Sequence, residues 1–223
     1  MTRGRTTYEH LRDRLISGEF TPGQRMKYED LRLDYKLSVS TVRELLFRLS
    51  SIGLVDFIEQ RGFRVPKETE ELRRDLAQSR ILLETEGACL SIRYGGVAWE
   101  SRLNAAHHEL KHIESHVSSA SAPPEELIPL WSTAELKFHR TLIEECRSEV
   151  LQQLHLQVYY RFRQQLISSN KHFGFITENV DQHQGILEAA LNHDEDLVSE
   201  RIYQHLARHL PEHLRKPPNT NHP

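Results

Sequence analysis

The chain has 223 residues, of which 38% are hydrophobic, and a formal net charge of -3, so it can bury one large core or two modest ones. No apolar run approaches the ~20 residues that a membrane span requires, and residues 1–5 lack the apolar core of a signal peptide, which predicts a cytoplasmic protein with no membrane partner. Two isolated cysteines, Cys89 and Cys146, form no CxxC motif and are typical of a reducing compartment.

Charge is divided unevenly along the chain. Residues 1–66 hold 12 Lys and Arg against 9 Asp and Glu, whereas the remainder holds 17 against 23. Of the 14 histidines, all but His10 lie beyond residue 66. A mildly basic segment on an acidic body indicates a nucleic-acid-binding module joined to a domain of another kind.

Three helices and a hairpin are predicted in residues 1–66. A capping box at residues 6–9 begins a first helix that Gly18 ends, a second helix covers residues 28–35, and Ser38 is a good N-cap for a third helix that Gly53 stops. The third helix has an apolar face at the 3-4-7 spacing, formed by Val42, Leu45, Leu46 and Leu49. Two β-rich runs then flank a basic tip, Gln60-Arg61-Gly62. This order predicts a winged helix-turn-helix.

Three motifs in this region resemble the DNA-binding domain of the GntR family of transcription regulators. They are Ile16-Ser17-Gly18-Glu19-Phe20-Thr21-Pro22-Gly23, then Ser38-Val39-Ser40-Thr41-Val42-Arg43-Glu44-Leu45-Leu46, then Arg61-Gly62-Phe63-Arg64-Val65. The resemblance implies that Arg43 contacts guanine O6 and N7 in the major groove. It also implies phosphate contacts by residues near the helix N-terminus and in the wing, namely Ser38, Ser40, Thr41, Arg61 and Gly62. Val39 and Thr41 stand where the family has arginine and proline.

Beyond a linker at residues 67–69, the chain is predicted to be helical. The apolar periodicity predicts helices over residues 70–94, 99–117, 125–146, 149–169, 177–192 and 194–210, and a disordered tail over residues 211–223. Six helices of this length form an antiparallel helical bundle. The fold is therefore predicted to be mostly α, with a winged helix-turn-helix at residues 1–66 and an effector-binding and dimerisation domain at residues 70–210.

A possible metal site begins with Glu135 and His139, which lie one helical turn apart on an otherwise apolar face. His183 and His205 lie on apolar faces of later helices. Each imidazole alone is typical of an ordinary buried histidine, but three imidazoles and one carboxylate together form a ligand set for a divalent transition metal. Zinc would be satisfied with four ligands, whereas nickel or manganese would keep open positions.

Two other features bear on this site. Arg80 lies on an inward helix face beside small residues, where its guanidinium would bind a small carboxylate effector opposite the metal; the alternative is a pair with Glu84 at i+4. The ladder of His108, His112 and His116 points roughly 140° away from the apolar stripe of its helix, so it is predicted to be solvated and to bind no metal.

Residues 70–210 resemble the FCD ligand-binding domain of the FadR-like branch of the GntR family. The matching segments are Glu135-Leu136-Lys137-Phe138-His139, His183-Gln184-Gly185-Ile186-Leu187 and, 22 residues after His183, His205; Glu135 stands where the family has aspartate. The resemblance implies a homodimer that reads a palindromic operator and senses a small organic acid at a metal. The predicted function is a transcriptional regulator, with repression favoured over activation.

Two alternatives remain open at this stage. The metal could itself be the signal, or the chain could be a helical metalloenzyme. Against the enzyme, the sequence contains no nucleophile motif and no glycine-rich phosphate loop, so we expect no enzymatic activity.

Overall fold

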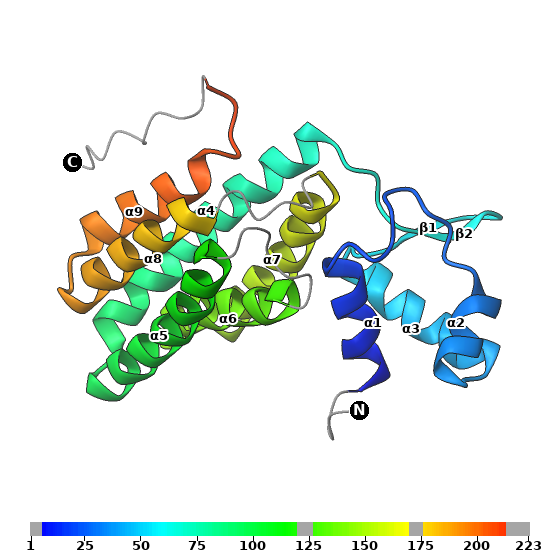
Figure 1. The fold of residues 1–223 in the computed structure, drawn as a ribbon, viewed down its shortest axis with the longest axis horizontal. Helices are drawn as coiled ribbons and strands as arrows, with labels where there is room; N and C mark the ends of the chain where they lie inside the picture. The colour runs from blue at the N-terminus through cyan, green and yellow to red at the C-terminus, as the bar shows by residue number, and fades with distance from the viewer. Residues whose placement is uncertain (1–5, 120–126, 170–175, 213–223) are drawn as a thin grey trace. The chain divides into compact units, whose positions relative to one another are not determined.

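The computed structural model describes residues 6–119, 127–169 and 176–212. These residues form two compact units, of which the first is Met1–Arg73 with Tyr160–Lys171 and the second is Arg74–Tyr159 with His172–Pro223, each taken for its described part. From residue 213 onward, the tail that was predicted to be disordered lies outside the described residues. Figure 1 shows the helices of both units.

The first unit contains the predicted winged helix-turn-helix. Its elements are α1 (Thr7–Ile16), α2 (Tyr28–Tyr35), α3 (Val39–Ser51), β1 (Asp56–Ile58) and β2 (Gly62–Arg64). The strands pair antiparallel, with Phe57 opposite Phe63. The capping box of α1 is present, with the Thr6 side chain accepting from the Glu9 N–H and the Glu9 side chain accepting from the Thr6 N–H. The predicted inward face of α3 is buried, including Leu46 and Leu49.

The last part of α7 (Glu149–Ser169) also belongs to the first unit. The Gln164 Nε2 donates to the Leu54 carbonyl at 3.1 Å, and the Gln165 Nε2 donates to the Lys67 carbonyl at 3.2 Å. Gly53 has φ 75°, a left-handed conformation that glycine adopts without strain, at the point where α3 ends beside the Arg161 side chain of α7. The sequence pattern gave no sign of this division within α7.

The second unit is built from α4 (Glu70–Tyr94), α5 (Val97–Ser119), α6 (Leu127–Leu142), the first part of α7, α8 (Ile176–Leu191) and α9 (Glu195–Ala207). These are the six predicted helices, so the mostly α fold class is confirmed. Helix α5 packs against α6 and α8, and α8 packs against α9. Buried aromatic side chains such as Trp99 and Phe138 fill the core between them. Among the described helices, none combines the length and apolar character that a membrane span needs.

Candidate metal centre

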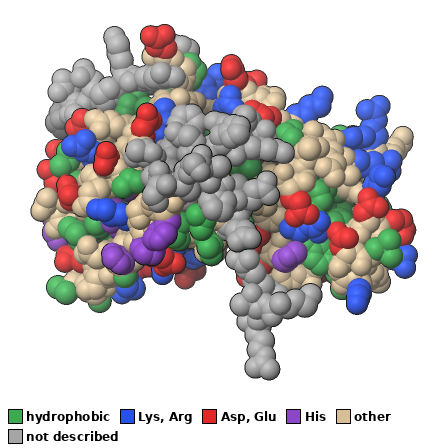
Figure 2. Space-filling view, in the orientation of Figure 1, with side chains coloured by type: hydrophobic (Ala, Val, Ile, Leu, Met, Phe, Trp, Pro, Cys, Tyr) green, Lys and Arg blue, Asp and Glu red, His purple; other side chains and the backbone are tan. Residues whose placement is uncertain are grey.

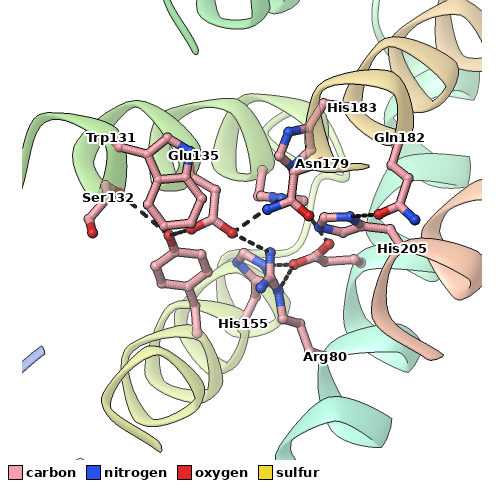
Figure 3. A network of polar contacts seen from close by, with 12 residues as sticks. Arg80, Trp131, Ser132, Glu135, His155, Asn179, Gln182, His183 and His205 are labelled. Atoms are coloured by element: carbon pink, nitrogen blue, oxygen red, sulfur yellow. Dashed lines mark hydrogen bonds and ion pairs between the residues drawn. The ribbon is translucent and has the colours of Figure 1, made fainter. Parts of the chain in front are cut away.

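The four predicted metal ligands come together in the core of the second unit. Glu135 and His139 project from α6, His183 from α8 and His205 from α9, as Figure 3 illustrates for the labelled residues. All four side chains are buried, and one ligand atom from each lies within 4.8 Å of those from the others. Three helices that are distant in sequence thus place three nitrogens and one oxygen around one point.

The unused atoms of this cluster suit a metal ion. The ring centroids of His139 and His183 are 5.4 Å apart, and those of His183 and His205 are 4.6 Å apart. Both ring nitrogens of His139 and of His183 are buried and make no hydrogen bond among the described residues, although carboxylate oxygens lie 3.0 and 3.2 Å from the Nδ1 atoms. Leaving buried nitrogens without a partner costs about 1–3 kcal/mol each, and coordination of a cation would satisfy them.

Glu135 is held by neighbouring side chains. The Tyr159 hydroxyl donates to the Glu135 Oε2 at 2.6 Å, and the Arg80 Nη2 lies 3.6 Å from Oε1. Oε1 is also 3.7 Å from the His139 Nε2, so this oxygen faces the cluster while Oε2 is occupied by tyrosine. Glu135 Oε1 therefore lies between the Arg80 guanidinium and the histidine cluster.

Arg80 is fully buried and pairs with Glu84, the alternative that its i+4 spacing allowed. Its guanidinium carbon also lies 4.8 Å from the centroid of the Tyr159 ring, a cation–π distance. Glu84 also contacts two histidines. Its Oε1 is 2.8 Å from the His155 Nε2, and its Oε2 is 3.0 Å from the His139 Nδ1. The carboxylate that meets Arg80 here thus comes from the protein itself.

Burial controls the protonation of the cluster. Desolvation lowers the pKa of His139 to about 4, although Glu84 opposes this shift, and desolvation also lowers the pKa of His205 well below its usual range. Burial would raise the pKa of Glu84, but the charge of Arg80 and the contacts with His139 and His155 outweigh it and hold that pKa well below the ordinary value. At neutral pH the two imidazoles are therefore uncharged, which is the form that binds a metal.

Sequence reasoning missed the residues that surround these ligands. Glu114 on α5 is buried and lies 3.2 Å from the His183 Nδ1, and Gln182 on α8 lies 3.0 Å from the His205 Nδ1. His155 and Tyr159 are spaced i, i+4 on α7 and are buried, a signal of the same kind as the one that marked Glu135 and His139.

The histidine ladder on α5 lies where it was predicted. His108, His112 and His116 are exposed. Figure 2 shows histidine side chains gathered on the surface at α5. The sequence analysis overlooked the neighbouring His107, which is buried edge-on against Phe138 with ring centroids 5.6 Å apart.

In the first unit, the expected DNA-binding residues lie on an exposed surface. Ser38, Ser40, Thr41, Arg43 and Arg61 are exposed, and Gly62 begins β2 with φ 76°. Figure 2 shows Lys and Arg side chains gathered at the end of this unit that carries the hairpin. Ser38 is the N-cap of α3, and its hydroxyl accepts a hydrogen bond from the Thr41 N–H at 3.2 Å. This hydroxyl therefore also stabilises the start of the helix.

An aromatic cluster joins α3, the predicted recognition helix, to the β1–β2 hairpin, the predicted wing. The rings of Phe47, Phe57 and Phe63 lie with centroids 4.9–5.0 Å apart. The Arg43 guanidinium lies 5.5 Å from the centroid of Phe47, which places its charge on the outer face of α3. The cluster fixes α3 and the hairpin as one surface.

Comparison with known proteins identifies both parts of the chain. Residues 3–65 match the model of the bacterial regulatory proteins of the gntR family, and residues 75–208 match the FCD domain. The chain is 31% identical over 204 residues to the HTH-type transcriptional regulator BphR of Paraburkholderia xenovorans, covering 90% of this chain and 80% of that protein. It is 29% identical over 212 residues to the HTH-type transcriptional repressor GlaR of Escherichia coli, covering 92% of each.

Solved structures have the same fold. The chain superposes on E. coli McbR/YncC with a TM-score of 0.75 at 17% identity, covering 90% of this chain and 92% of the other. It superposes on a GntR-type transcriptional regulator from Rhodococcus sp. RHA1 with a TM-score of 0.72 at 21% identity and the same coverage. At these identities the match concerns the fold alone.

Proposed function

Because this chain belongs to the GntR family of transcriptional regulators and carries an FCD domain, we propose that a divalent metal held by Glu135, His139, His183 and His205 controls its affinity for operator DNA. The observation that carries this proposal is the buried cluster of one carboxylate and three imidazoles, whose ligand atoms lie within 4.8 Å of one another. Three nitrogen ligands and one oxygen favour zinc, with nickel and manganese as alternatives.

On the DNA side, we assign direct base contact to Arg43 and phosphate contacts to Ser40, Thr41, Arg61 and Gly62. Arg43 is exposed on α3, and an arginine can bind guanine O6 and N7 with two hydrogen bonds. We further propose a homodimer, because two recognition helices related by a two-fold axis match a palindromic operator. The relative GlaR is a transcriptional repressor, which supports repression here.

The proposed regulation has two forms, which differ in the molecule that acts as the signal. In the first, a small carboxylate effector binds beside the metal and takes the place of Glu84 on Arg80. In the second, the metal alone is the signal. The contact of Arg80 with Glu84 favours the second form, because an effector must break a buried ion pair to reach the guanidinium. The relatives are transcriptional regulators, so no argument remains for a metalloenzyme.

The test combines metal analysis with DNA binding. Zinc content of the purified protein is measured by mass spectrometry, and an operator is selected from a random DNA library with the same protein. Operator affinity is then compared for chelator-treated protein, zinc-loaded protein, and zinc-loaded protein with a panel of small carboxylic acids. A change with zinc alone supports the second form, and a change only on acid addition supports the first. Equal affinity in all three states would contradict the proposal.

A further inference from the structure

We propose that Glu114, together with Gln182 and Glu84, positions the three histidines for metal binding by holding the Nδ1 edge of each ring. In this arrangement each Nε2 faces the metal. The inference rests on the proposed metal site and adds to it the residues that set ring orientation and charge. Such outer partners typically change metal affinity by about 10–100-fold.

Glu114 is the partner of His183. Its side chain is 1% exposed, and its Oε1 lies 3.2 Å from the His183 Nδ1. The same oxygen accepts a hydrogen bond from the Trp131 Nε1 at 3.1 Å, which fixes the carboxylate in place. Because a carboxylate only accepts, the proton of a neutral His183 belongs on Nδ1, and Nε2 keeps its lone pair for the metal.

The other two histidines follow the same pattern with partners from their surroundings. The His205 Nδ1 lies 3.0 Å from the Gln182 Oε1, as Figure 3 illustrates, and an amide oxygen is likewise an acceptor. The His139 Nδ1 lies 3.0 Å from the Glu84 Oε2. One acceptor oxygen therefore lies within 3.2 Å of each Nδ1, and these oxygens favour the tautomer in which Nδ1 carries the proton and Nε2 keeps its lone pair.

The charges of the buried groups also fit a divalent ion. Glu84, Glu114 and Glu135 are at most 4% exposed and carry three formal negative charges, while Arg80, 1% exposed, carries one positive charge. Among the buried Asp, Glu, Lys and Arg side chains that the structure describes in the second unit, the balance is two negative charges, which equals the charge of one divalent cation. Arg208 also acts on Glu135, but it is partly exposed and pairs with Glu178 at 3.8 Å. Two of the anions touch histidines instead of the metal position, so they raise the affinity of the imidazoles for a cation.

The central test is the substitution Glu114→Gln, which keeps an acceptor for Trp131 and removes the charge. Zinc affinity of the full-length protein is measured by competition with a chromogenic chelator. We expect E114Q to bind zinc about tenfold or more weakly than the wild type. The matched control is Glu109→Gln on the same helix, because Glu109 is exposed and pairs with Lys137, and it should bind zinc as the wild type does.

Two further measurements separate positioning from folding. The metal-free E114Q protein should melt no earlier than metal-free wild type, because glutamine has nearly the same shape as glutamate and keeps the acceptor for the Trp131 Nε1. The substitution Gln182→Glu should bind zinc several-fold more tightly, a gain that a folding defect cannot produce. The cobalt-substituted E114Q protein should show altered visible absorption bands, which report ligand geometry.

The outcomes distinguish this inference from the proposed function. A wild-type protein that binds no zinc overturns the metal site and the inference together. A wild-type protein that binds zinc, with E114Q within twofold of it, overturns the role of Glu114 and leaves the metal site standing. Weaker zinc binding that is matched by earlier melting of the metal-free protein would show a merely structural role and would also overturn the inference.

Discussion

At the scale of single residues, Glu135 is the one carboxylate among the four proposed metal ligands. Glu135 has one methylene more than an aspartate, and its Oε2 accepts a hydrogen bond from the Tyr159 hydroxyl. The extra length is therefore absorbed by a hydrogen bond, and the other oxygen remains directed at the histidines. This arrangement predicts one-oxygen coordination by Glu135.

Substitution of the ligands tests the site directly. Glu135→Ala and His139→Ala should each reduce bound zinc to a small fraction of the wild-type amount, because three ligands hold the ion far less well than four. Glu135→Asp should retain zinc, since aspartate keeps a carboxylate ligand at this position. Metal content after dialysis is the measurement. Wild-type zinc content in both alanine variants would mean that the ion, if present, is bound elsewhere.

A second residue-scale prediction concerns Arg43. Replacing it with alanine should cost about 1–3 kcal/mol of operator binding and relax the preference for one base pair, because a bidentate contact to guanine is lost. Arg61→Ala should weaken binding to all sequences alike and reduce its salt dependence. Both effects are read from gel-shift titrations at several salt concentrations. Unchanged sequence preference in R43A would contradict its assignment as the base-reading residue.

The burial of His107 leads to a prediction of how the stability of the fold depends on pH. Its pKa is lowered to about 4 by burial, with further contributions from nearby His183 and Lys111. Because this folded-state pKa lies below the unfolded value of about 6.5, the stabilising contribution is present above pH 6.5 and is lost as the pH falls toward 4.

The experiment compares urea unfolding of zinc-free wild type and His107→Gln at pH 7 and pH 5. The wild type should lose roughly 1 kcal/mol more stability over this interval, a figure reduced for solvent screening. His108→Gln is the control, because His108 is exposed on the same helix. Parallel losses in wild type and H107Q would refute the role of His107.

At the scale of secondary-structure elements, α7 is the helix that both units share. Its first part supplies His155, which binds Glu84, and Tyr159, which binds Glu135. Its last part supplies Gln164 and Gln165, which bind the backbone at Leu54 and Lys67. Because a helix is a stiff element and α7 is continuous between the two units, we propose that it couples occupancy of the proposed metal site to the DNA-binding unit.

Coupling through α7 predicts that zinc binding and the effect of zinc on operator affinity can be separated by substitution. Gln164→Ala should bind zinc with wild-type affinity but show a smaller ratio between operator affinities with and without zinc, because the hydrogen bond to Leu54 is lost. Zinc titration gives the zinc affinity, and gel shifts on the same samples give the ratio of operator affinities with and without zinc. Gln153→Ala, at an exposed position of the same helix, is the control and should keep the full ratio. A normal zinc response in Q164A would rule out this route.

At the scale of the whole molecule, the proposed homodimer leads to a prediction about mass and operator binding. A homodimer should have twice the monomer mass of 26.1 kDa by light scattering, and one dimer should bind one palindromic operator. Splitting the operator into isolated half-sites should lower the affinity for DNA by several orders of magnitude, since each winged helix-turn-helix then binds alone. Full-affinity binding of a monomer to a half-site would contradict the two-fold arrangement.

The sequence alone determined much of this protein, because the decisive signals are local. Caps, helix-stopping glycines and apolar periodicity placed the helices within a few residues and identified the winged helix and the helical bundle. The same periodicity predicted that Glu135, His139, His183 and His205 face inward, as they do. Periodicity within one helix shows which residues share its apolar face, so this part of the information is available without tertiary structure.

Only the tertiary structure decided which side chains meet across the core. The pairing of Glu84 with His139, of Glu114 with His183 and of Tyr159 with Glu135 joins different helices, and no spacing within one helix encodes it. The division of α7 between the two units is equally invisible to periodicity. The physical reason is that helical periodicity sets the direction of a side chain relative to its own axis, whereas the partner it meets depends on how whole helices pack.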